Sequence, residues 1–433
     1  MMDILAKNQF FNLLVDNFKL MDDDLDEVRK KGLHQFKKLG LPKFRSEEYK
    51  YTNISKALDK VFGEQIIAAE PNISKEEIDS ILPDDLNANL IIILNGKYSK
   101  NYSNIESVHG LSVMGFNEAK RSNGNILNNI SSSFDKIFDP FVALNTASLN
   151  DGIVIKIESG IQINKPLHIA YVSDTKTNQS FQHPRALIIA DNNSEFSLIE
   201  SFYTLGEHPS FNNVVTEIIL GKNTHCSYYK IGSENDNSYH VGTTQVTQNK
   251  DSTFTGTTIN LNGAIIRNNL NIILNARNCE AYIYGLYLLK GKQHVDNHTI
   301  VDHRKPDCYS NELYKGILDE NATGVFNGKI FVRPNAQKTN AFQSNKNILL
   351  TDTATINTKP QLEIWADDVK CSHGCTTGQL DQEQIFYLRS RGINYDSARA
   401  MVLHAFAMDI LEKIKIEPLK NYLDRKISKR LHG

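Results

Sequence analysis

Paired cysteines, long apolar runs and a strong net charge are all missing from this sequence of 433 residues. Its five cysteines are widely spread and include no Cys-x-x-Cys pair, which argues against a disulfide framework and predicts reduced thiols in a cytoplasmic protein. No segment approaches the roughly 20 apolar residues that cross a bilayer, and the first residues do not resemble a secretory signal. The formal net charge of −2 favours neither nucleic acid nor an anionic membrane as a partner.

A phosphate-binding loop is also missing. Two Gly-Lys pairs invite that interpretation, Gly328-Lys329 with Gly324 upstream and Gly291-Lys292. Neither fits the G-x-x-x-x-G-K-[S/T] pattern, because the glycines are too close together and no hydroxyl residue follows either lysine. We interpret these glycines as corner residues of the fold, and we expect no nucleotide-binding site and no ATP hydrolysis in this chain.

The N-terminal sequence has the spacing of helices. Apolar residues recur at three- and four-residue intervals over 10–21 and again over 28–39, and Gly40 is placed to end the second helix. Ser74 with Glu77 predicts a capping box, and residues 90–94 predict a buried strand. The segment 44–51 is aromatic and charged without a clear period.

The C-terminal sequence is helical as well. Asp381 can cap a helix that ends at Gly392, and Asp396 or Ser397 can cap a strongly apolar helix over 398–414. Pro418 is expected to break that helix ahead of a basic tail.

Between about 152 and 370, short β-branched and aromatic runs alternate with turn residues. Asn193, Asn223, Asp251 and Asn278 each precede an alternating strand and are separated by 30, 28 and 27 residues, and Asn321 resumes the pattern. Such periods predict a solenoid, although an antiparallel sandwich also gives evenly spaced short strands. We therefore expect a mainly β protein with a β-solenoid core over 91–375, a mainly helical region over 1–90 and a helical region over 376–433.

The first candidate site is a polar cluster on one predicted strand. His294, Asp296 and His298 would share one face of a strand, with His303 nearby, so a metal or proton-transfer cluster is one interpretation. A polar ladder on the outer face of a solenoid gives the same pattern, and the role of the cluster stays open.

The second candidate site is the segment Cys371-Ser372-His373-Gly374-Cys375. Thiolate and imidazole are ligands of soft metals and iron–sulfur clusters, and Cys371 and His373 point the same way if the segment is extended. Three ligands do not complete a tetrahedral site, so a partner chain would have to contribute. The alternative is a buried cysteine beside a histidine that bonds backbone carbonyls.

The residues from about 294 to 411 closely resemble the SufB/SufD family of the SUF iron–sulfur cluster assembly system. The motifs that carry the resemblance are His294-x-Asp296-x-x-Thr299, Tyr314-Lys315-Gly316, Phe326-x-Gly328-Lys329-Ile330, Thr339-x-Ala341-x-Gln343-x-Asn345 and the run from Pro360 through Asp367-Asp368 to Cys371-Ser372-His373-Gly374. Upstream, Arg45-Ser-Glu47-Glu48-Tyr49 also looks like the entry segment of the SufD branch, and the Cys371–Gly374 segment separates the chain from the SufB branch.

The resemblance implies a right-handed parallel β-helix that acts as a non-catalytic scaffold, paired with SufB and docked to the ATPase SufC, or homodimeric when SufB is absent. His373 would hold or gate a nascent iron–sulfur cluster at the SufB–SufD interface, a SufB cysteine would supply a further ligand, and Cys371 adjoins this place. No cofactor is expected in the isolated chain. The resemblance assigns SufC docking to the C-terminal helices, in which the candidate contact residues are Phe386, Leu388, Met401 and Val402.

Two other functions stay open at this point. A β-solenoid also suits carbohydrate-active enzymes, which are usually secreted and need a groove of clustered acids and bases, often with Ca²⁺. A homodimeric structural solenoid without cluster chemistry is the second, although it would not need the Cys-Ser-His-Gly segment.

Overall fold

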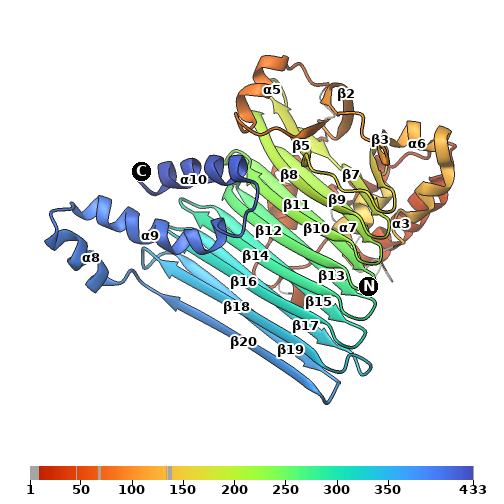
Figure 1. The fold of residues 1–433 in the computed structure, drawn as a ribbon. Helices are drawn as coiled ribbons and strands as arrows, with labels where there is room; N and C mark the ends of the chain where they lie inside the picture. Colours follow the sequence, from red (N-terminus) through yellow and green to blue (C-terminus); the bar gives the residue numbers. More distant parts are fainter. Residues whose placement is uncertain (1–8, 45, 67–69, 133, 135–138, 433) are drawn as a thin grey trace.

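The computed structural model describes residues 9–44, 46–66, 70–132, 134 and 139–432, so Arg45 lies outside the described residues. Two long sheets face each other along a flattened solenoid, with helices at both ends of the chain covering its outer faces (Figure 1). In the described part of the chain, no helix is long and apolar enough to cross a membrane. The predicted mainly β fold with a solenoid core and flanking helices is confirmed.

The described residues form two ten-stranded sheets. Sheet A runs in the order β2 (Lys97–Asn104), β1 (Asn89–Leu94), β5 (Leu167–Thr175), β8 (Glu195–Gly206), β10 (His225–Ser233), β12 (Thr253–Asn262), β14 (Glu280–Leu289), β16 (Tyr309–Leu318), β18 (Thr339–Leu349) and β20 (Val369–Gly378). Sheet B runs in the order β19 (Thr355–Ile364), β17 (Thr323–Val332), β15 (His294–His303), β13 (Ile265–Leu274), β11 (Ser238–Gln248), β9 (Ser210–Leu220), β7 (Arg185–Ala190), β4 (Gly152–Ile157) and β3 (Leu111–Gly115), and β6 (Ser180–Gln182) also pairs with β9.

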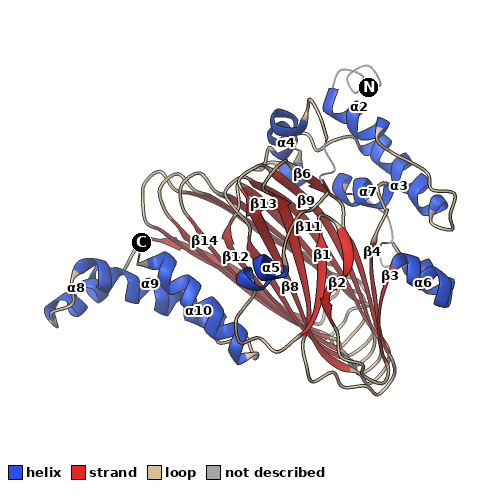
Figure 2. Ribbon diagram, turned by 90° about the horizontal axis from the view of Figure 1, so that it is seen from above, coloured by secondary structure: helices blue, strands red, loops and turns tan. Residues whose placement is uncertain are grey.

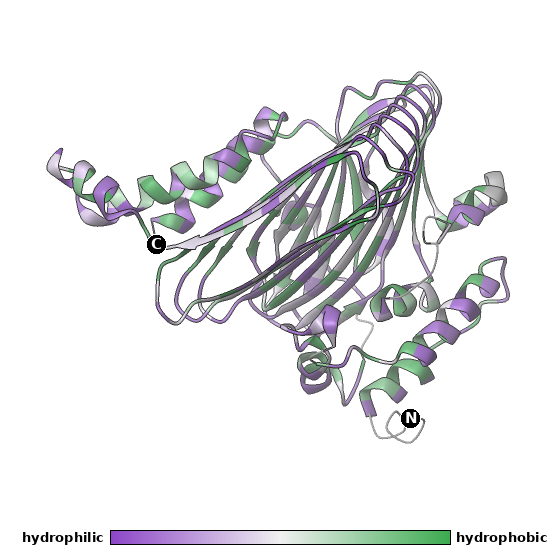
Figure 3. Ribbon diagram, turned by 90° about the horizontal axis from the view of Figure 1, so that it is seen from below, coloured by the Kyte–Doolittle hydropathy of each residue, from purple (hydrophilic) through white to green (hydrophobic). Residues whose placement is uncertain are grey.

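From β7 onward, successive strands alternate between the two sheets, and the pairs from β5 and β4 onward are parallel. Because the strands of each sheet pair in register, equivalent lumen-facing residues of successive coils form columns, with one residue from each coil. Hydrophobic and hydrophilic residues alternate along the strands, because successive side chains point to opposite faces (Figure 3). Side chains from both sheets form one hydrophobic core in the lumen, which includes Phe254, Ile283, Ile272 and Ile330.

The predicted repeat corresponds to one corner of the solenoid. Asn193, Asn223, Asp251 and Asn278 all have positive φ angles of 54 to 61°, a conformation that Asn and Asp tolerate better than most residues. The amide of Asn223 donates to Asn193 one coil away at 3.0 Å. The corner therefore needs a left-handed residue in each coil, which is why the repeat is visible in the sequence.

The prediction that Asn321 resumes this repeat is wrong. It lies in the turn before β17 of sheet B, whereas the four earlier members precede strands of sheet A. The same corner continues instead at Asp307, with a φ of 62°, and at Lys338, with a φ of 59°. Lysine is not a typical left-handed residue, so the sequence gives little sign of that last corner.

Beside this corner, hydroxyl and thiol side chains stack from coil to coil. Ser252 donates to the carbonyl of Asn249 at 2.6 Å, and the sulfurs of Cys279 and Cys308 each lie 3.2 Å from the carbonyl oxygen of Ala276. The thiols supply donors to the turn carbonyl of Ala276, and the Ser252 hydroxyl adds a second donor to the carbonyl of Asn249, which also accepts from the Ser252 backbone amide. Both cysteines thus have a structural role in the described fold.

Two of the glycines interpreted as corner residues lie elsewhere. Gly291 has a φ of 66° in a turn, as predicted, but Gly324 and Gly328 lie inside strand β17. A Cβ atom at Gly328 would clash with the amide of Gln343, which reaches across the lumen from sheet A. Gly328 is therefore needed for close packing between the sheets.

Most of the N-terminal helices cover sheet B on one side of the solenoid, opposite the C-terminal helices (Figure 2), whereas α5 (Lys75–Ile81) packs on strands of sheet A. The helical elements before the solenoid are α2 (Gln9–Asp16), α3 (Asp26–Leu39), the 3-10 turn Glu47–Tyr49, α4 (Ile54–Phe62), α5 (Lys75–Ile81), α6 (Phe116–Asn123), the 3-10 turn Gly124–Asn129 and α7 (Pro140–Ala147).

Several N-terminal predictions can be compared with these elements. Gly40 follows α3 with a φ of 67°, and the capping box of Ser74 and Glu77 is present. The first helix is shorter than the predicted 10–21, because α2 ends at Asp16. Apolar residues after that point continue the helical period without forming helix.

The C-terminal helices are α8 (Gln382–Ser390), α9 (Tyr395–Leu411) and α10 (Glu417–Leu431), and α9 and α10 pack on the outer face of sheet A (Figure 1). Asp381 caps α8 as predicted. The cap of α9 is Asn394 and not Asp396 or Ser397, so the predicted helix over 398–414 is shifted by one turn. Pro418 begins α10 instead of ending the helical region, because proline is tolerated in the first turn of a helix.

Candidate functional site

The Cys-Ser-His-Gly-Cys segment forms the central half of β20, the last strand of sheet A. This strand pairs with β18 on one side and lies at the end of the strand order. His373 and Cys375 are exposed and Cys371 is half-buried. The last coil is thus open at the edge of the solenoid within the described residues.

The register of β20 decides where these side chains point. Cys371 is paired with Ala341, and His373 is paired with Gln343. Ala341 belongs to the lumen core and Cys371 packs against that core. Since alternate residues of a strand face the same side, Cys371, His373 and Cys375 all face the open end of the lumen.

The thiol of Cys371 is held in its neutral form. Partial burial raises its pKa, and a hydrogen bond involving the backbone of Ala341 opposes this shift only in part. A cysteine must lose its proton to bind a metal, so metal binding at Cys371 would release a proton. Among the described residues, no group of three or more His, Cys, Asp or Glu side chains is arranged to hold a metal ion.

Two buried polar residues continue the column of His373 into the lumen. Gln343 precedes His373 in the column, and Glu312 precedes Gln343. The Gln343 amide nitrogen donates to a Glu312 carboxyl oxygen at 2.7 Å, and the residues are 2% and 1% exposed. Burial raises the pKa of Glu312 from 4.5 to about 7, although hydrogen bonds with Thr299 and Gln343 oppose this shift.

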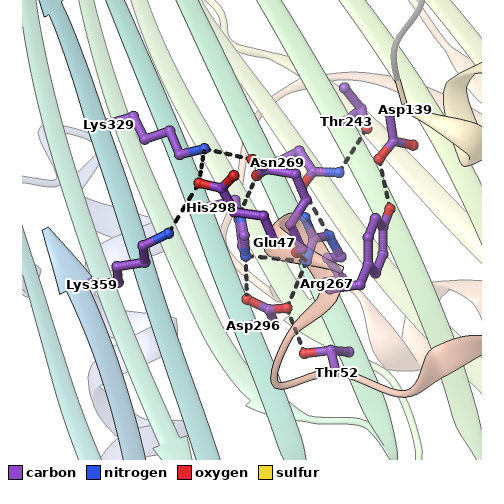
Figure 4. Close-up of polar contacts among 12 residues, drawn as sticks. Glu47, Thr52, Asp139, Thr243, Arg267, Asn269, Asp296, His298, Lys329 and Lys359 are labelled. Carbon is purple, nitrogen blue, oxygen red and sulfur yellow. Dashed lines mark hydrogen bonds and ion pairs between the residues drawn. The ribbon is translucent and has the colours of Figure 1, made fainter. Parts of the chain in front are cut away.

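The polar cluster of β15 lies elsewhere, on the outer face of sheet B, where it binds an N-terminal segment (Figure 4). The hydroxyl oxygen of Thr52 lies 2.8 Å from a ring nitrogen of His294 and donates to Asp296 at 2.5 Å. Arg267 forms an ion pair with Asp296 at 2.7 Å and donates to the carbonyl of Glu48 at 2.8 Å. We call residues 47–52 the strap, because these contacts hold them across the sheet.

The charges at the strap are balanced across several coils. His298 lies 2.9 Å from Asp296 and 3.7 Å from the carboxylate of Glu48, and Lys329 donates to Glu48 at 2.5 Å. Burial opposes the ionisation of Asp296, yet the charges of His298 and Arg267 hold its pKa well below the usual range. The interactions of Glu48 with His298 and Lys329 lower the pKa of this carboxyl to about 2 despite its partial burial. The arrangement stabilises two carboxylates and a docked segment.

His303 does not join the other histidines. It is buried, and a ring nitrogen lies 2.9 Å from the hydroxyl of Ser310. Burial lowers the pKa of His303 to about 4, which keeps the ring neutral. The cluster of four thus separates into three residues at the strap and one inside the solenoid.

The four residues suggested for partner docking lie on α8 and α9. Phe386 is 74% exposed and Met401 is 48% exposed, while Leu388 and Val402 are partly exposed. The opposite side of α9 is buried on sheet A through Leu403 and its neighbours. These helices therefore present apolar side chains to solvent while another side anchors them.

Sequence reasoning missed Arg267, Glu312 and Gln343 as site residues. Gln343 stands in a motif that carries the family resemblance, which is the one signal available for it. Arg267 and the strap are separated by more than 200 residues, as shown by the sequence distance of 219 between Arg267 and Glu48. Only the folded coils bring them together.

Two family models match the chain. Residues 171–406 match the SufBD core domain of SUF system FeS cluster assembly, and residues 6–169 match the SufBD protein N-terminal region. Together they span the solenoid and the strap.

Known proteins agree with the family models. The chain is 33% identical to the iron–sulfur cluster assembly SufBD family protein slr0076 of Synechocystis, over 90% of this chain and 88% of that protein. It is 31% identical to the iron–sulfur cluster assembly protein SufD of Escherichia coli, over 93% of this chain and 92% of that protein. Protein ABCI7, chloroplastic, of Arabidopsis thaliana is 30% identical over 64% of this chain and 59% of its own length. Because both its N-terminal region and its core match, the chain belongs to the SufBD family of the SUF iron–sulfur cluster assembly system.

Proposed function

We propose that this chain is a non-catalytic scaffold subunit that pairs with a SufB-type subunit and holds or gates a nascent iron–sulfur cluster at His373. The observation that carries the proposal is the open end of the solenoid, where His373 and Cys371 face the lumen from an edge strand. Such an edge has unpaired backbone groups that a second chain can cover. The family membership removes the reason to keep a carbohydrate-active enzyme as an alternative.

The cluster is the cargo of this site and not a resident cofactor. Imidazole and thiolate are suitable ligands for iron–sulfur clusters, but the described residues alone offer too few of them at this place. A partner cysteine would complete the ligand set at the interface. In the absence of SufB, two copies of this chain would cover the same edge in a homodimer.

The C-terminal helices would dock a SufC-type ATPase through Phe386, Leu388, Met401 and Val402. Exposed apolar side chains of this kind are typical of protein interfaces. Lys315 of β16 donates to the carbonyl of Phe406 at 3.0 Å and pairs with Asp409, which ties α9 to sheet A. Closure of the ATPase on ATP would then pull on α8 and α9 and rearrange the edge at β20.

The test of the cluster site is coexpression with SufB- and SufC-type partners, anaerobic reconstitution and absorbance spectroscopy. His373→Ala should reduce the cluster absorbance of the complex by at least several-fold. Ser372→Ala is the matched control, because Ser372 is the neighbouring residue on the other face of the same strand. Unchanged cluster assembly by the His373→Ala complex would contradict the proposal.

The test of docking is a pull-down of the ATPase with charged variants of α8. Phe386→Asp should abolish capture, whereas Gln384→Asp adds the same charge at another exposed position of this helix and should retain it. Equal capture by both variants would show that α8 is not part of the docking surface.

A further inference from the structure

The amide of Gln343 has one end fixed and one end free. Its nitrogen donates to Glu312, and its oxygen is buried without a hydrogen-bond partner among the described residues. A buried acceptor that forms no hydrogen bond is costly, and native proteins keep few of them. The free oxygen therefore needs a donor that the described structure does not supply.

His373 is the neighbouring member of the same lumen column. Its register partner is Gln343, one strand away, and the two side chains face the same side of the sheet. Glu312 and Gln343, which are neighbours in this column on adjacent strands, already form a side-chain hydrogen bond of 2.7 Å. His373 is the next residue of the column on the other side of Gln343, and its imidazole ring can donate an N–H hydrogen bond.

The surroundings fix the direction of the amide. The Gln343 amide occupies the space left by the missing side chain of Gly328 on the opposite sheet. The amide nitrogen of Gln343 donates to Glu312, so its amide oxygen is the atom that can accept from a further donor. A histidine that binds a metal through one ring nitrogen commonly donates from the other to a carboxylate or carbonyl oxygen, which sets its tautomer and orientation.

We propose that Gln343, held in place by Glu312, is a positioning residue that accepts a hydrogen bond from one ring nitrogen of His373 and leaves the other nitrogen free to bind the cluster. This inference rests on the proposed role of His373 and identifies the residues that orient its imidazole ring. Neither Gln343 nor Glu312 touches the cluster. Their effect is to select one tautomer of the imidazole.

The test is the tautomer of His373 in the intact chain, measured by nitrogen NMR of protein labelled with ¹⁵N-histidine. The sequence has 13 histidines, and the His373 signals are assigned by their loss in His373→Gln. Wild-type protein should show one dominant neutral tautomer. Gln343→Met removes the acceptor at similar size and should shift the tautomer ratio of His373 toward that of the exposed His34.

Two further variants separate positioning from general disturbance of the lumen. Glu312→Leu removes the anchor of the amide and should also shift the tautomer ratio, although Glu312 is two strands from His373. Asn347→Leu removes another buried amide of β18, one that accepts from Tyr287 at 2.5 Å, and should leave the ratio of His373 unchanged. It also controls for loss of stability.

An unchanged tautomer ratio in both Gln343→Met and Glu312→Leu would overturn the inference. In the reconstituted complex, Gln343→Met should lower cluster absorbance less than His373→Ala does. If His373→Ala has no effect on cluster assembly while the tautomer responds to Gln343→Met, the proposed function fails and the positioning of His373 stands. If His373→Ala abolishes assembly and the tautomer does not respond, only the positioning fails.

Discussion

Arg267 and Asp296 form an ion pair of 2.7 Å in which each side chain is only 2% exposed. The two residues occupy neighbouring coils and are directly paired in register on the outer face of sheet B. Together they bind the strap, through the carbonyl of Glu48 and the hydroxyl of Thr52. The N-terminal region is thus attached to the solenoid by a buried charge pair.

Asp296→Asn should destabilise the protein strongly, because it leaves the Arg267 guanidinium buried without its countercharge. Loss of one partner of a buried pair costs about 3 to 5 kcal/mol. The loss is measured as the change in free energy of unfolding by urea, together with faster proteolysis in the strap. Lys359→Ala is the control, since its ion pair with Glu47 is solvent-exposed at 3.2 Å and is worth about 1 kcal/mol or less. Similar losses for the two variants would contradict a central role of the buried pair.

The thiols should react in the order of their exposure. Cys375 is exposed, Cys371 is half-buried, and Cys226, Cys279 and Cys308 are buried. Burial raises the pKa of Cys226 far above its usual value and raises that of Cys371 more weakly, and the thiolate is the reactive form. A disulfide reagent should therefore label Cys375 rapidly and Cys371 slowly, and the other thiols only after denaturation. Cys375→Ser should remove the fast phase, and a fast phase that survives this change would place the reactive thiol elsewhere.

The sequence allowed prediction of local features but not of contacts between distant coils. The left-handed corners are visible because Asn and Asp recur there, and the histidine pattern of β15 follows from strand alternation. The strap could not be predicted, since Thr52 and Asp296 are 244 residues apart. Similarly, the exposed side chain of His373 is predictable as a ligand type, whereas the support from Gln343 and Glu312 depends on the exact register of three strands.

Glu312→Gln should change how stability depends on pH. Burial raises the pKa of Glu312 from 4.5 to about 7 in the folded state, so the folded chain binds this proton more tightly than the unfolded chain. The stability that the protonated form contributes is complete below pH 4.5 and is lost as the pH rises toward 7. At about 1.4 kcal/mol per pKa unit, the wild-type protein should lose about 3 kcal/mol relative to the variant across this interval.

The measurement is the free energy of unfolding of both proteins in urea from about pH 4 to about pH 8, which brackets the interval between the pKa of 4.5 in the unfolded chain and about 7 in the folded chain. The difference between the two curves isolates Glu312 from the other titrating groups. Parallel curves would mean that the lumen does not raise the pKa of Glu312 above its value in the unfolded chain.

Gly328→Ala should destabilise the solenoid through its effect on Gln343. A Cβ atom at Gly328 would clash with the amide of Gln343 and approach the ring of Phe326 at 2.9 Å. The amide must then move away from Glu312, which breaks a buried hydrogen bond of 2.7 Å. Overpacking of this kind costs about 1 to 3 kcal/mol, measured by urea unfolding.

The matched control is Gly374→Ala on the edge strand β20. A Cβ atom at Gly374 meets nothing within 4 Å, so this variant should retain wild-type stability to within about 0.5 kcal/mol. The variant Gly328→Ala should also shift the tautomer ratio of His373, because a displaced Gln343 no longer directs its oxygen toward that column. If Gly328→Ala lowers the stability but leaves the tautomer ratio of His373 unchanged, Gly328 is needed only for packing between the sheets and does not affect the orientation of His373. If both change together, the lumen packing and the orientation of His373 depend on the same glycine.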